Sequence, residues 1–265
     1  MPKELITSLH SPHVERVKAL SNSRAKKIRA QSQEFLIDSW PALHTALNSK
    51  SVKSPKILSI YGVESGLERL KEFALSPEIE IFEVSDRVLT EMVEVESSIG
   101  VLAIGSTIEA KFESFETARK VLYLWQMQDP GNAGTIIRSA DASGFDLVIF
   151  SPESVDIYSS KVIRAAAGSH WNIPVISEVP FSECLDFFHN RGHEIYALDA
   201  KGQVEVSTLP KNHPIFLLFG NEARGIPSLP GFVKTAFIPM KGEAESFNVA
   251  TSAAIAMYEV GLRPL

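Results

Sequence analysis

The hydrophobic pattern of the last fifty residues, 214–265, predicts two strands and a helix. The uninterrupted apolar run 215–219 is typical of a buried strand. A second short apolar segment, 235–238, predicts another strand. Residues 246–260 are rich in alanine and contain no glycine or proline, which predicts a helix capped by Ser246.

These predicted elements end or begin in loops of small and polar residues. The first strand runs into a glycine-bearing turn at 220–225, and the second runs into a polar loop that reaches Ser246. The ends of parallel strands meet at one edge of a sheet, and ligands bind at such edges. We therefore expect a binding site where these loops meet.

The first hundred residues show a similar alternation of helical and strand patterns. Residues 12–32 predict one basic amphipathic helix. The strands that follow are expected at 34–38, 56–61, 79–84 and 100–104, and the helices at 41–47, 65–75 and 86–95. This spacing predicts a small α/β domain over residues 1–106. The polar segment 107–120 lacks a clear period and is expected to be a linker.

A second alternation begins at residue 121 and predicts a larger α/β domain over 121–265. Its further strands are expected at 121–126, 147–150, 174–176 and 194–198, and its further helices at 135–143, 159–167 and 181–191. Strands that alternate with helices in this way form a largely parallel sheet covered on both faces.

Composition indicates an ordinary soluble globular protein of 265 residues, 45% hydrophobic and 22% charged. No apolar stretch approaches the roughly 20 residues that a membrane span needs. The start of the chain resembles neither a signal peptide nor a transit peptide. A single cysteine, Cys184, excludes an internal disulfide and is expected to be a buried hydrophobic side chain. A cytoplasmic enzyme is the expectation.

Charge is distributed unevenly along the chain. Residues 1–60 contain ten Lys or Arg and four Asp or Glu, whereas residues 61–265 contain 16 and 28. Such an asymmetry indicates an anionic partner for the N-terminal segment. A solvated helix face would explain the same cluster, and charge alone leaves the two interpretations open.

The segment that follows the predicted strand 121–126 could bind an anion. Gly131 and Gly134 permit a tight turn before the predicted helix, whose N-terminal amides favour a phosphate. Arg138 could clamp a phosphate with two parallel hydrogen bonds. A capped helix with a surface arginine is the simpler alternative. No glycine-rich nucleotide-binding motif is present, so a dinucleotide or P-loop site has no support.

The other polar residues do not indicate a function by themselves. Glu222 could bind a ligand or solvate its turn, while Ser246 and Asn248 could be helix caps. His189 and His193 are four residues apart, but Gly192 interrupts the helix that would align them, so no metal site is expected.

Taken together, these segments resemble the three signature motifs of the SpoU (TrmH-like) family of SPOUT RNA 2′-O-ribose methyltransferases. The motifs correspond to residues 129–144, 218–225 and 238–250, and 158–174 is similar to the middle segment of the family. The resemblance covers residues 121–265. Residues 1–106 resemble, less sharply, the RNA-binding substrate domain of the family.

This resemblance implies a deep C-terminal trefoil knot, S-adenosylmethionine as cofactor, a homodimer that completes the site, and methyl transfer to a ribose 2′-hydroxyl. Ribosomal RNA is favoured over transfer RNA because of the extra N-terminal domain. The cofactor-binding residues it implies are Leu198, Gly220, Ile238, Met240 and Phe247. The catalytic residues it implies are Asn132, Arg138, Glu222, Ser246 and Asn248. The expected RNA-binding residues are Lys26, Lys27, Arg29 and Arg164.

The chemistry of these residue types is compatible with such a reaction. An ordinary guanidinium keeps its proton, so Arg138 cannot be a base as it stands. The family resemblance suggests that it acts with an RNA phosphate or in an environment that lowers its pKa. Our hypothesis is that Arg138 activates the hydroxyl, Asn132 and Ser246 fix the ribose, and Asn248 and Glu222 order the loops.

Two other function classes are compatible with the fold. A non-catalytic RNA-binding or assembly protein could retain it, although the intact motif residues argue against this class. A small-molecule nucleotide enzyme is disfavoured because phosphate-loop signatures are absent.

Two short segments and one residue depart from patterns common in the family. They are Ile37-Asp38-Ser39, Ser98-Ile99-Gly100 and Ser160. All lie outside the three motifs, so they bear on which RNA is recognised rather than on cofactor binding.

Overall fold

The computed structural model describes residues 2–22, 25–51, 54–93, 100–108, 110–221, 225–226 and 228–262. The chain divides into two compact units. The first comprises residues 1–108 together with 158–172, and the second comprises 109–157 together with 173–265.

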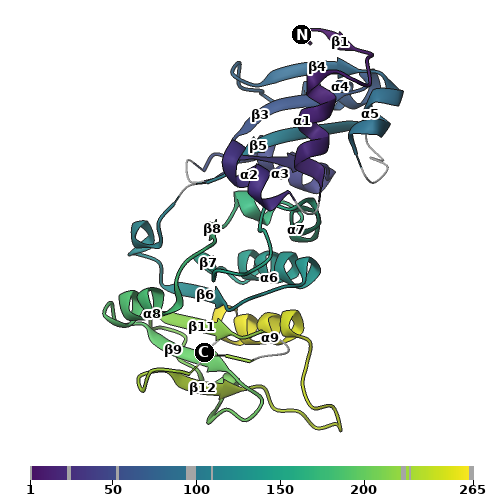
Figure 1. Cartoon of the computed structure of the whole chain (residues 1–265). Coiled ribbons are helices and arrows are strands. Elements are labelled where there is room, and N and C mark those ends of the chain that lie inside the picture. The colour runs from purple at the N-terminus through teal and green to yellow at the C-terminus, as the bar shows by residue number, and fades with distance from the viewer. Residues whose placement is uncertain are drawn as a thin grey trace. The chain divides into compact units, whose positions relative to one another are not determined.

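The first unit is built on a five-stranded sheet with the strand order β1-β4-β3-β5-β2 (Figure 1). Its strands are β1 (Leu5–Ile6), β2 (Glu34–Ile37), β3 (Ile57–Gly62), β4 (Glu80–Val84) and β5 (Val101–Ser106). Strand β5 runs antiparallel to both neighbours, while the other pairs are parallel. The pattern predicted four of these strands and missed β1, which has only two residues.

Helices of the first unit follow the predicted positions with one difference. They are α1 (Pro12–Ser21), α2 (Lys26–Ser32), α3 (Trp40–Asn48), α4 (Glu64–Glu68), the 3₁₀ turn η1 (Arg69–Glu72), α5 (Asp86–Met92), α7 (Ser160–Ala166) and the 3₁₀ turn η3 (Ser169–Trp171). The single helix predicted over 12–32 is two helices, because the chain leaves helical geometry at Asn22, which has ψ 127°.

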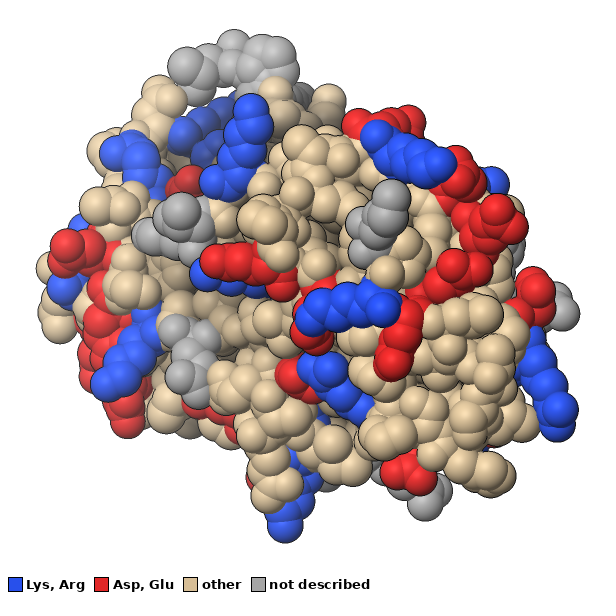
Figure 2. All heavy atoms as spheres, turned by 90° about the horizontal axis from the view of Figure 1, so that it is seen from above, with Lys and Arg blue, Asp and Glu red and all other residues tan. Residues whose placement is uncertain are grey.

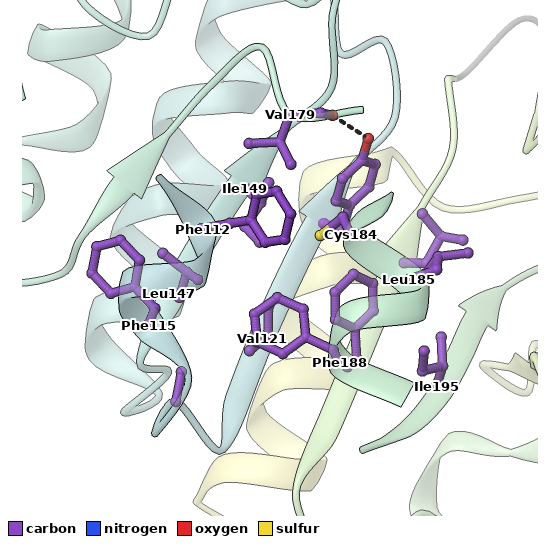
Figure 3. Packing of buried hydrophobic residues seen from close by; sticks show 14 of the residues in the cluster. Phe112, Phe115, Val121, Leu147, Ile149, Val179, Cys184, Leu185, Phe188 and Ile195 are labelled. Atoms are coloured by element: carbon purple, nitrogen blue, oxygen red, sulfur yellow. Dashed lines mark hydrogen bonds between the residues drawn. The ribbon is translucent and has the colours of Figure 1, made fainter. Parts of the chain in front are cut away.

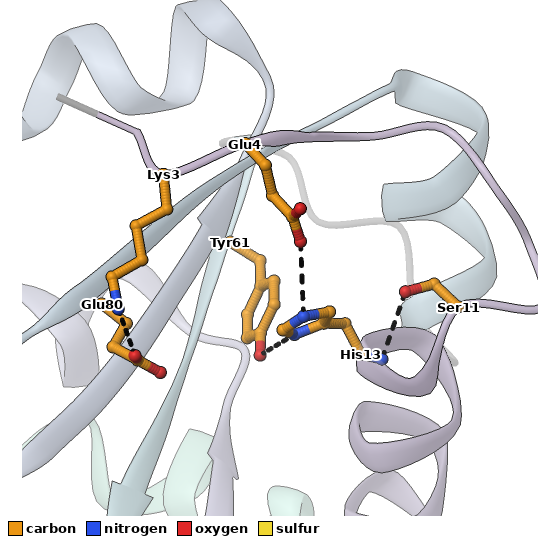
Figure 4. A network of polar contacts seen from close by, with 6 residues as sticks. All are labelled: Lys3, Glu4, Ser11, His13, Tyr61 and Glu80. Atoms are coloured by element: carbon orange, nitrogen blue, oxygen red, sulfur yellow. Dashed lines mark hydrogen bonds and ion pairs between the residues drawn. The ribbon is translucent and has the colours of Figure 1, made fainter.

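A polar network stands beside the apolar core of this unit (Figure 4). His13 lies on α1, where its Nδ1 is 3.0 Å from the hydroxyl of Tyr61 and its ring packs against Phe82 at 4.4 Å between centroids. The carboxylate of Glu4 lies 3.6 Å from Nε2 of the same ring. Burial raises the pKa of Tyr61, so its hydroxyl keeps its proton. The network joins the segment before β1 to helix α1.

Residues 158–172 belong to the first unit although both flanking segments belong to the second. The indole Nε1 of Trp171 donates to the carbonyl of Pro55 at 2.9 Å, and Trp171 is buried. The hydroxyl of Tyr158 accepts from the amide of Ile108 at 3.0 Å, and its ring packs on Phe35 at 4.7 Å. Large aromatic side chains buried in this way explain why the segment is part of the first unit, whereas the sequence pattern placed it in the C-terminal domain.

The second unit contains a seven-stranded sheet with the order β10-β12-β9-β11-β6-β7-β8. Its strands are β6 (Lys120–Leu124), β7 (Leu147–Phe150), β8 (Val175–Ile176), β9 (Glu194–Leu198), β10 (Val204–Glu205), β11 (Ile215–Phe219) and β12 (Lys234–Phe237). Every pair is parallel. The prediction of an α/β fold with a large parallel sheet is confirmed, and only the two-residue β10 was missed.

Helices cover this sheet, and each buries one apolar stripe. They are the 3₁₀ turn η2 (Phe112–Phe115), α6 (Pro130–Ala142), α8 (Phe181–His189), the 3₁₀ turn η4 (Val206–Thr208) and α9 (Val249–Gly261). Helices α6 and α9 pack side by side (Figure 1). On the α8 side, Cys184, Leu185 and Phe188 meet alternate side chains of the central strands (Figure 3).

The segment predicted to be a linker, 107–120, contributes to this core. Phe112 and Phe115 of η2 are buried in the same cluster as α8. Two aromatic residues three positions apart give too short a pattern to predict a helix, yet together they bury a large apolar area. Cys184 is fully buried, as expected, and burial raises the pKa of its thiol.

Folding largely cancels the positive charge of the N-terminal segment. The first unit contains 15 Lys or Arg and 14 Asp or Glu. Arg16 and Lys18 of α1 form ion pairs with Glu34 and Glu91. Figure 2 shows a face on which basic and acidic side chains lie interspersed. The basic excess seen in the sequence is therefore offset by residues that come later in the chain.

Among the described residues, no helix is both long and apolar enough to cross a membrane.

Candidate active site

A pocket of about 500 Å³ opens at the carboxyl ends of β9, β11 and β12, beside the start of α9. It is lined by all five residues that the family resemblance assigned to the cofactor: Leu198, Gly220, Ile238, Met240 and Phe247. Ser246 and Asn248, assigned to catalysis, line it as well. The expectation that loops from separate strands meet at one sheet edge is confirmed.

The turn after β11 is folded back tightly at Gly220. A Cβ atom at this position would lie 2.6 Å from the carbonyl carbon of Gly225 and 2.5 Å from Cγ1 of Ile226, so only glycine fits. Asn221 and Gly225 exchange two backbone hydrogen bonds, and Nδ2 of Asn221 donates to the carbonyl of Gln126 at 2.8 Å. The turn is thereby tied to the end of β6. Glu222 lies outside the described residues.

Helix α9 begins later than predicted, with Asn248 as its N-cap. The Oδ1 atom of Asn248 accepts from the amides of Ala250 at 2.9 Å and Thr251 at 3.3 Å. Ser246, the predicted cap, instead lies exposed in the loop that lines the pocket. The cap prediction was wrong because both residue types cap helices and the pattern could not choose between them.

Helix α6 begins earlier than predicted, at Pro130. Asp129 is its N-cap and accepts from the amide of Asn132 at 2.7 Å. Gly131 and Gly134 therefore lie within the helix rather than in a turn before it, and Gly134 is buried against the core. Proline at the first helical position suits this start, because its missing amide hydrogen would have no partner there.

A direct hydrogen bond joins the first and third motifs. Nδ2 of Asn248 donates to Oδ1 of Asn132 at 3.1 Å. Since the Oδ1 of Asn248 is held by the amides of α9, its Nδ2 is oriented toward Asn132. Two catalytic candidates that lie 116 positions apart in sequence thus form one rigid pair at the pocket.

Arg138, the predicted activating residue, does not line this pocket. It is exposed on α6 and forms no hydrogen bond or ion pair with the part of the chain that the structure describes. At about 100° per residue, it lies roughly 120° around the helix from Asn132. Asn132 and Arg138 therefore face different directions.

The four predicted RNA-binding residues lie in the first unit and differ in their exposure to solvent. Lys26 and Lys27 are exposed on α2. Arg29 is only 2% exposed and donates to the carbonyls of Leu20 and Asn22 at 2.6 and 3.0 Å. This corrects the prediction for Arg29, because its guanidinium holds the end of α1 and is not presented to a phosphate.

Arg164 also interacts with another residue of the first unit. It forms an ion pair with the carboxylate of Asp38, whose side chain is 6% exposed. Asp38 is one of the positions that depart from the family pattern. The partly exposed guanidinium of Arg164 is therefore already matched by a negative charge.

The two histidines considered as metal ligands have structural roles. His189 stacks on Phe232 with 4.0 Å between ring centroids. His193 is buried between the carbonyls of Ala118 and Phe188, at 2.8 and 3.1 Å, and burial lowers its pKa. Among the described residues, no group of three His, Cys, Asp or Glu side chains could hold a metal ion.

Comparison with known proteins decides which family this site belongs to. The sequence model of the SpoU rRNA Methylase family matches residues 119–258, more than half of the chain. The chain belongs to the SpoU rRNA methylase family.

Some relatives and solved structures match along nearly the whole chain. The 23S rRNA (guanosine(2553)-2′-O)-methyltransferase RlmP of Bacillus subtilis is 31% identical over 95% of this chain and 98% of its own length. The solved structure of an AdoMet-bound rRNA methyltransferase from Sinorhizobium meliloti is 26% identical, covers 97% of this chain and 96% of its own, and has a TM-score of 0.83. The SpoU methyltransferase AviRb from Streptomyces viridochromogenes, 23% identical with a TM-score of 0.80 over 95% of this chain and 97% of its own, shares the fold.

Two residues at the SpoU pocket were missed by sequence reasoning. Asp199 directly follows β9 and lines the pocket, and Asn221 follows Gly220. The signal for Asp199 was present, because it comes straight after a predicted strand that ends at the same sheet edge. Asn221 stood beside the more conspicuous Glu222.

Proposed function

We propose that this chain is an RNA methyltransferase that transfers a methyl group from S-adenosylmethionine to a ribose 2′-hydroxyl of ribosomal RNA. The observation that carries the proposal is that the second and third motif segments line one pocket, to which the first motif is joined by the bond between Asn132 and Asn248. The 2′-O-methyltransferase activity of the Bacillus subtilis relative and the AdoMet-bound structural neighbour support the same reaction and cofactor.

The pocket fits a nucleoside cofactor. Its volume of about 500 Å³ lies in the usual range for small-molecule sites. Its walls combine apolar side chains, such as Ile238 and Phe247, with a few polar groups and a glycine turn that lets the backbone approach closely. When bound, S-adenosylmethionine supplies a methyl group already activated by its positive sulfur.

The residues of the chain would align and deprotonate the acceptor. The Asn132–Asn248 pair and Ser246 lie at the pocket and would hold the ribose and the loops around it. The 2′-hydroxyl is a poor nucleophile until its proton leaves. Arg138 would assist this step together with an RNA phosphate, to which a guanidinium can donate two parallel bonds. Glu222, which lies outside the described residues, would order the turn after β11.

A second copy of the chain would complete the site. Arg138 is exposed on a flank of α6 that faces away from Asn132. Beside it, α9 presents an outward apolar stripe of Ile255, Tyr258 and Leu262, the last two being 53% and 52% exposed. An exposed stripe of this kind is typical of an interface. We propose that two copies pair along α6 and α9, which brings Arg138 of one copy to the acceptor site of the other.

The trefoil knot is part of the same proposal. Strand β11 lies between β9 and β6, both of which precede it in the sequence, and β12 returns to the far side of β9. Helix α9 then crosses back to pack on α6. Strand β11 thus inserts between two strands that precede it in the sequence. This arrangement supports a threaded C-terminal segment.

Cofactor binding and methyl transfer to separate RNAs test the proposal. Wild-type protein should bind S-adenosylhomocysteine in a calorimeter and transfer tritiated methyl groups from S-adenosylmethionine to ribosomal RNA, with the product mapped as a 2′-O-methylated ribose. If methyl groups were transferred to transfer RNA only, transfer RNA would take the place of ribosomal RNA as the proposed substrate. Cofactor and RNA binding without transfer would favour the non-catalytic alternative, and failure to bind the cofactor would overturn the proposal.

Substitution of Arg138 tests its role. Arg138→Ala should lower kcat by about 100-fold, as expected for loss of a group acting in proton transfer, while S-adenosylhomocysteine affinity stays unchanged because Arg138 does not line the pocket. Arg138→Lys keeps the charge and should recover little, because lysine lacks the planar fork. Thr135→Ala, also exposed on α6, is the matched control. Full transfer by Arg138→Ala would exclude the assigned role.

A further inference from the structure

Asp199 is the only charged side chain among the described residues that line the pocket. It directly follows β9, which lies between β12 and β11 in the sheet. Its carboxylate is exposed to solvent, so it stays charged at the pocket and can accept hydrogen bonds from a ligand.

The turn that carries Asp199 is fixed. Its amide donates to the carbonyl of Ala236 at 2.9 Å, and its Oδ1 accepts from the amide of Lys201 at 2.8 Å. At Gly202, a Cβ atom would lie 2.5 Å from the carbonyl carbon of Ala236, so the turn is pressed against β12. These contacts engage Oδ1, while Oδ2 accepts no hydrogen bond from the residues that the structure describes. One oxygen thus remains available to a ligand on a rigid support.

The sheet order separates Asp199 from the acceptor end of the pocket. Strand β11 separates β9 from β6, so the end of β9 lies roughly 10 Å from the end of β6 at the usual strand spacing. Asn132 follows β6 and bonds to Asn248, at which we place the acceptor ribose. Asp199 therefore lies two strands away from the strand that leads to Asn132, where a part of the cofactor other than the transferred methyl group can reach it.

We propose that the carboxylate of Asp199 binds the ribose hydroxyls of the methyl donor. This inference rests on the proposed function, since it names a contact for the cofactor of that reaction. A carboxylate accepts hydrogen bonds only, and the available Oδ2 can accept from a ribose hydroxyl, which is a donor. Asp199 thereby selects a ribonucleoside and anchors the adenosine end while Asn132 and Asn248 align the other.

Ligand binding without turnover tests this contact. Wild-type protein and Asp199→Asn are titrated with S-adenosylhomocysteine, with 5′-methylthioadenosine, which lacks the amino-acid part, and with adenosine and 2′-deoxyadenosine as competitors. The asparagine keeps an Oδ1 for the amide of Lys201 but loses the charge. We expect a loss of about tenfold in affinity, equal for S-adenosylhomocysteine and 5′-methylthioadenosine, as for one charged hydrogen bond. Wild-type protein should prefer adenosine to 2′-deoxyadenosine, and the variant should not.

The controls separate this inference from the proposed function. Asp186→Asn, exposed on α8 and remote from the pocket, should bind like wild type. Asp199→Ala provides a second variant, and its thermal unfolding shows whether the turn is intact. Loss confined to S-adenosylhomocysteine would assign Asp199 to the amino group of the cofactor and overturn the inference, as would unchanged binding by Asp199→Asn. If the wild type binds no S-adenosylhomocysteine, it is the proposed function that fails.

Discussion

At the scale of single residues, Asn248 connects the start of a helix with a catalytic candidate. Its Oδ1 caps α9, and its Nδ2 donates to Asn132. The two roles use opposite ends of one amide group. They can therefore be separated by a change that removes only the donor.

Asn248→Asp should lower kcat by about tenfold, the value of one lost hydrogen bond of about 1.4 kcal/mol. The aspartate retains the cap and suits the positive end of α9, so the free energy of unfolding should stay within about 0.5 kcal/mol of wild type. Asn248→Ala loses the cap as well, and should unfold about 1 kcal/mol more easily. Urea unfolding and single-turnover methyl transfer give the two quantities. Unchanged transfer by Asn248→Asp would show that the bond to Asn132 has no part in catalysis.

At the scale of elements, α9 lines the pocket with its first residues and carries on its outward side the surface proposed to pair with a second copy. Ala253, Ala256 and Met257 are buried against the unit, while Tyr258 and Leu262 are exposed. At Gly261 a Cβ atom would lie 2.3 Å from the carbonyl oxygen of Ser143, so the end of α9 lies close against the end of α6. The exposed stripe is the surface that we propose pairs with a second copy.

Tyr258→Asp should convert the proposed dimer to monomers at micromolar concentration, because it places a charge in the apolar stripe. Light scattering coupled to gel filtration measures the mass. Since Tyr258 is exposed, thermal unfolding of the isolated chain should change little. Leu5→Asp, an equally exposed apolar position in the first unit, is the control and should leave the mass unchanged. A wild-type monomer would contradict the proposed pairing.

The sequence predicted the long elements well and their junctions poorly. Strand β11 was evident because five apolar residues stand between breakers, and its burial follows from helices on both faces. The start of α9 was misplaced because Ser246 and Asn248 are equally good caps, and only the path of the loop decides between them. Arg29 was misassigned because a basic residue on an amphipathic helix looks exposed until α1 and α2 are known to fold against each other. Asp199 was missed because a lone carboxylate after a strand has no motif.

At the scale of the whole molecule, the first unit is completed by a segment from far along the chain. Tyr158 and Trp171 are buried there, and Trp171 also donates to Pro55. The SpoU family match covers 119–258 and therefore includes this segment. The boundary of the matched region and the boundary of the folded unit are different.

A fragment containing residues 109–265 should therefore aggregate or bind a hydrophobic dye, because the aromatic side chains of 158–172 lose their partners. Gel filtration and dye fluorescence measure this. The same fragment with Tyr158→Ser and Trp171→Ser should recover solubility, since the exposed apolar area is reduced. A soluble unmodified fragment with full S-adenosylhomocysteine affinity would show that the segment does not need the first unit.

The discontinuity of the first unit also sets an order for folding during synthesis. Domains generally fold as they leave the ribosome, with the N-terminal one first. Here the first unit is incomplete until residue 172 has emerged, because Trp171 and the ion pair between Arg164 and Asp38 belong to it. By then the ribosome has already made β6, α6 and β7 of the second unit. The N-terminal segment is thus translated first, but the folding of its unit is completed late. A nascent chain stalled before residue 158 would expose the apolar surface that chaperones bind.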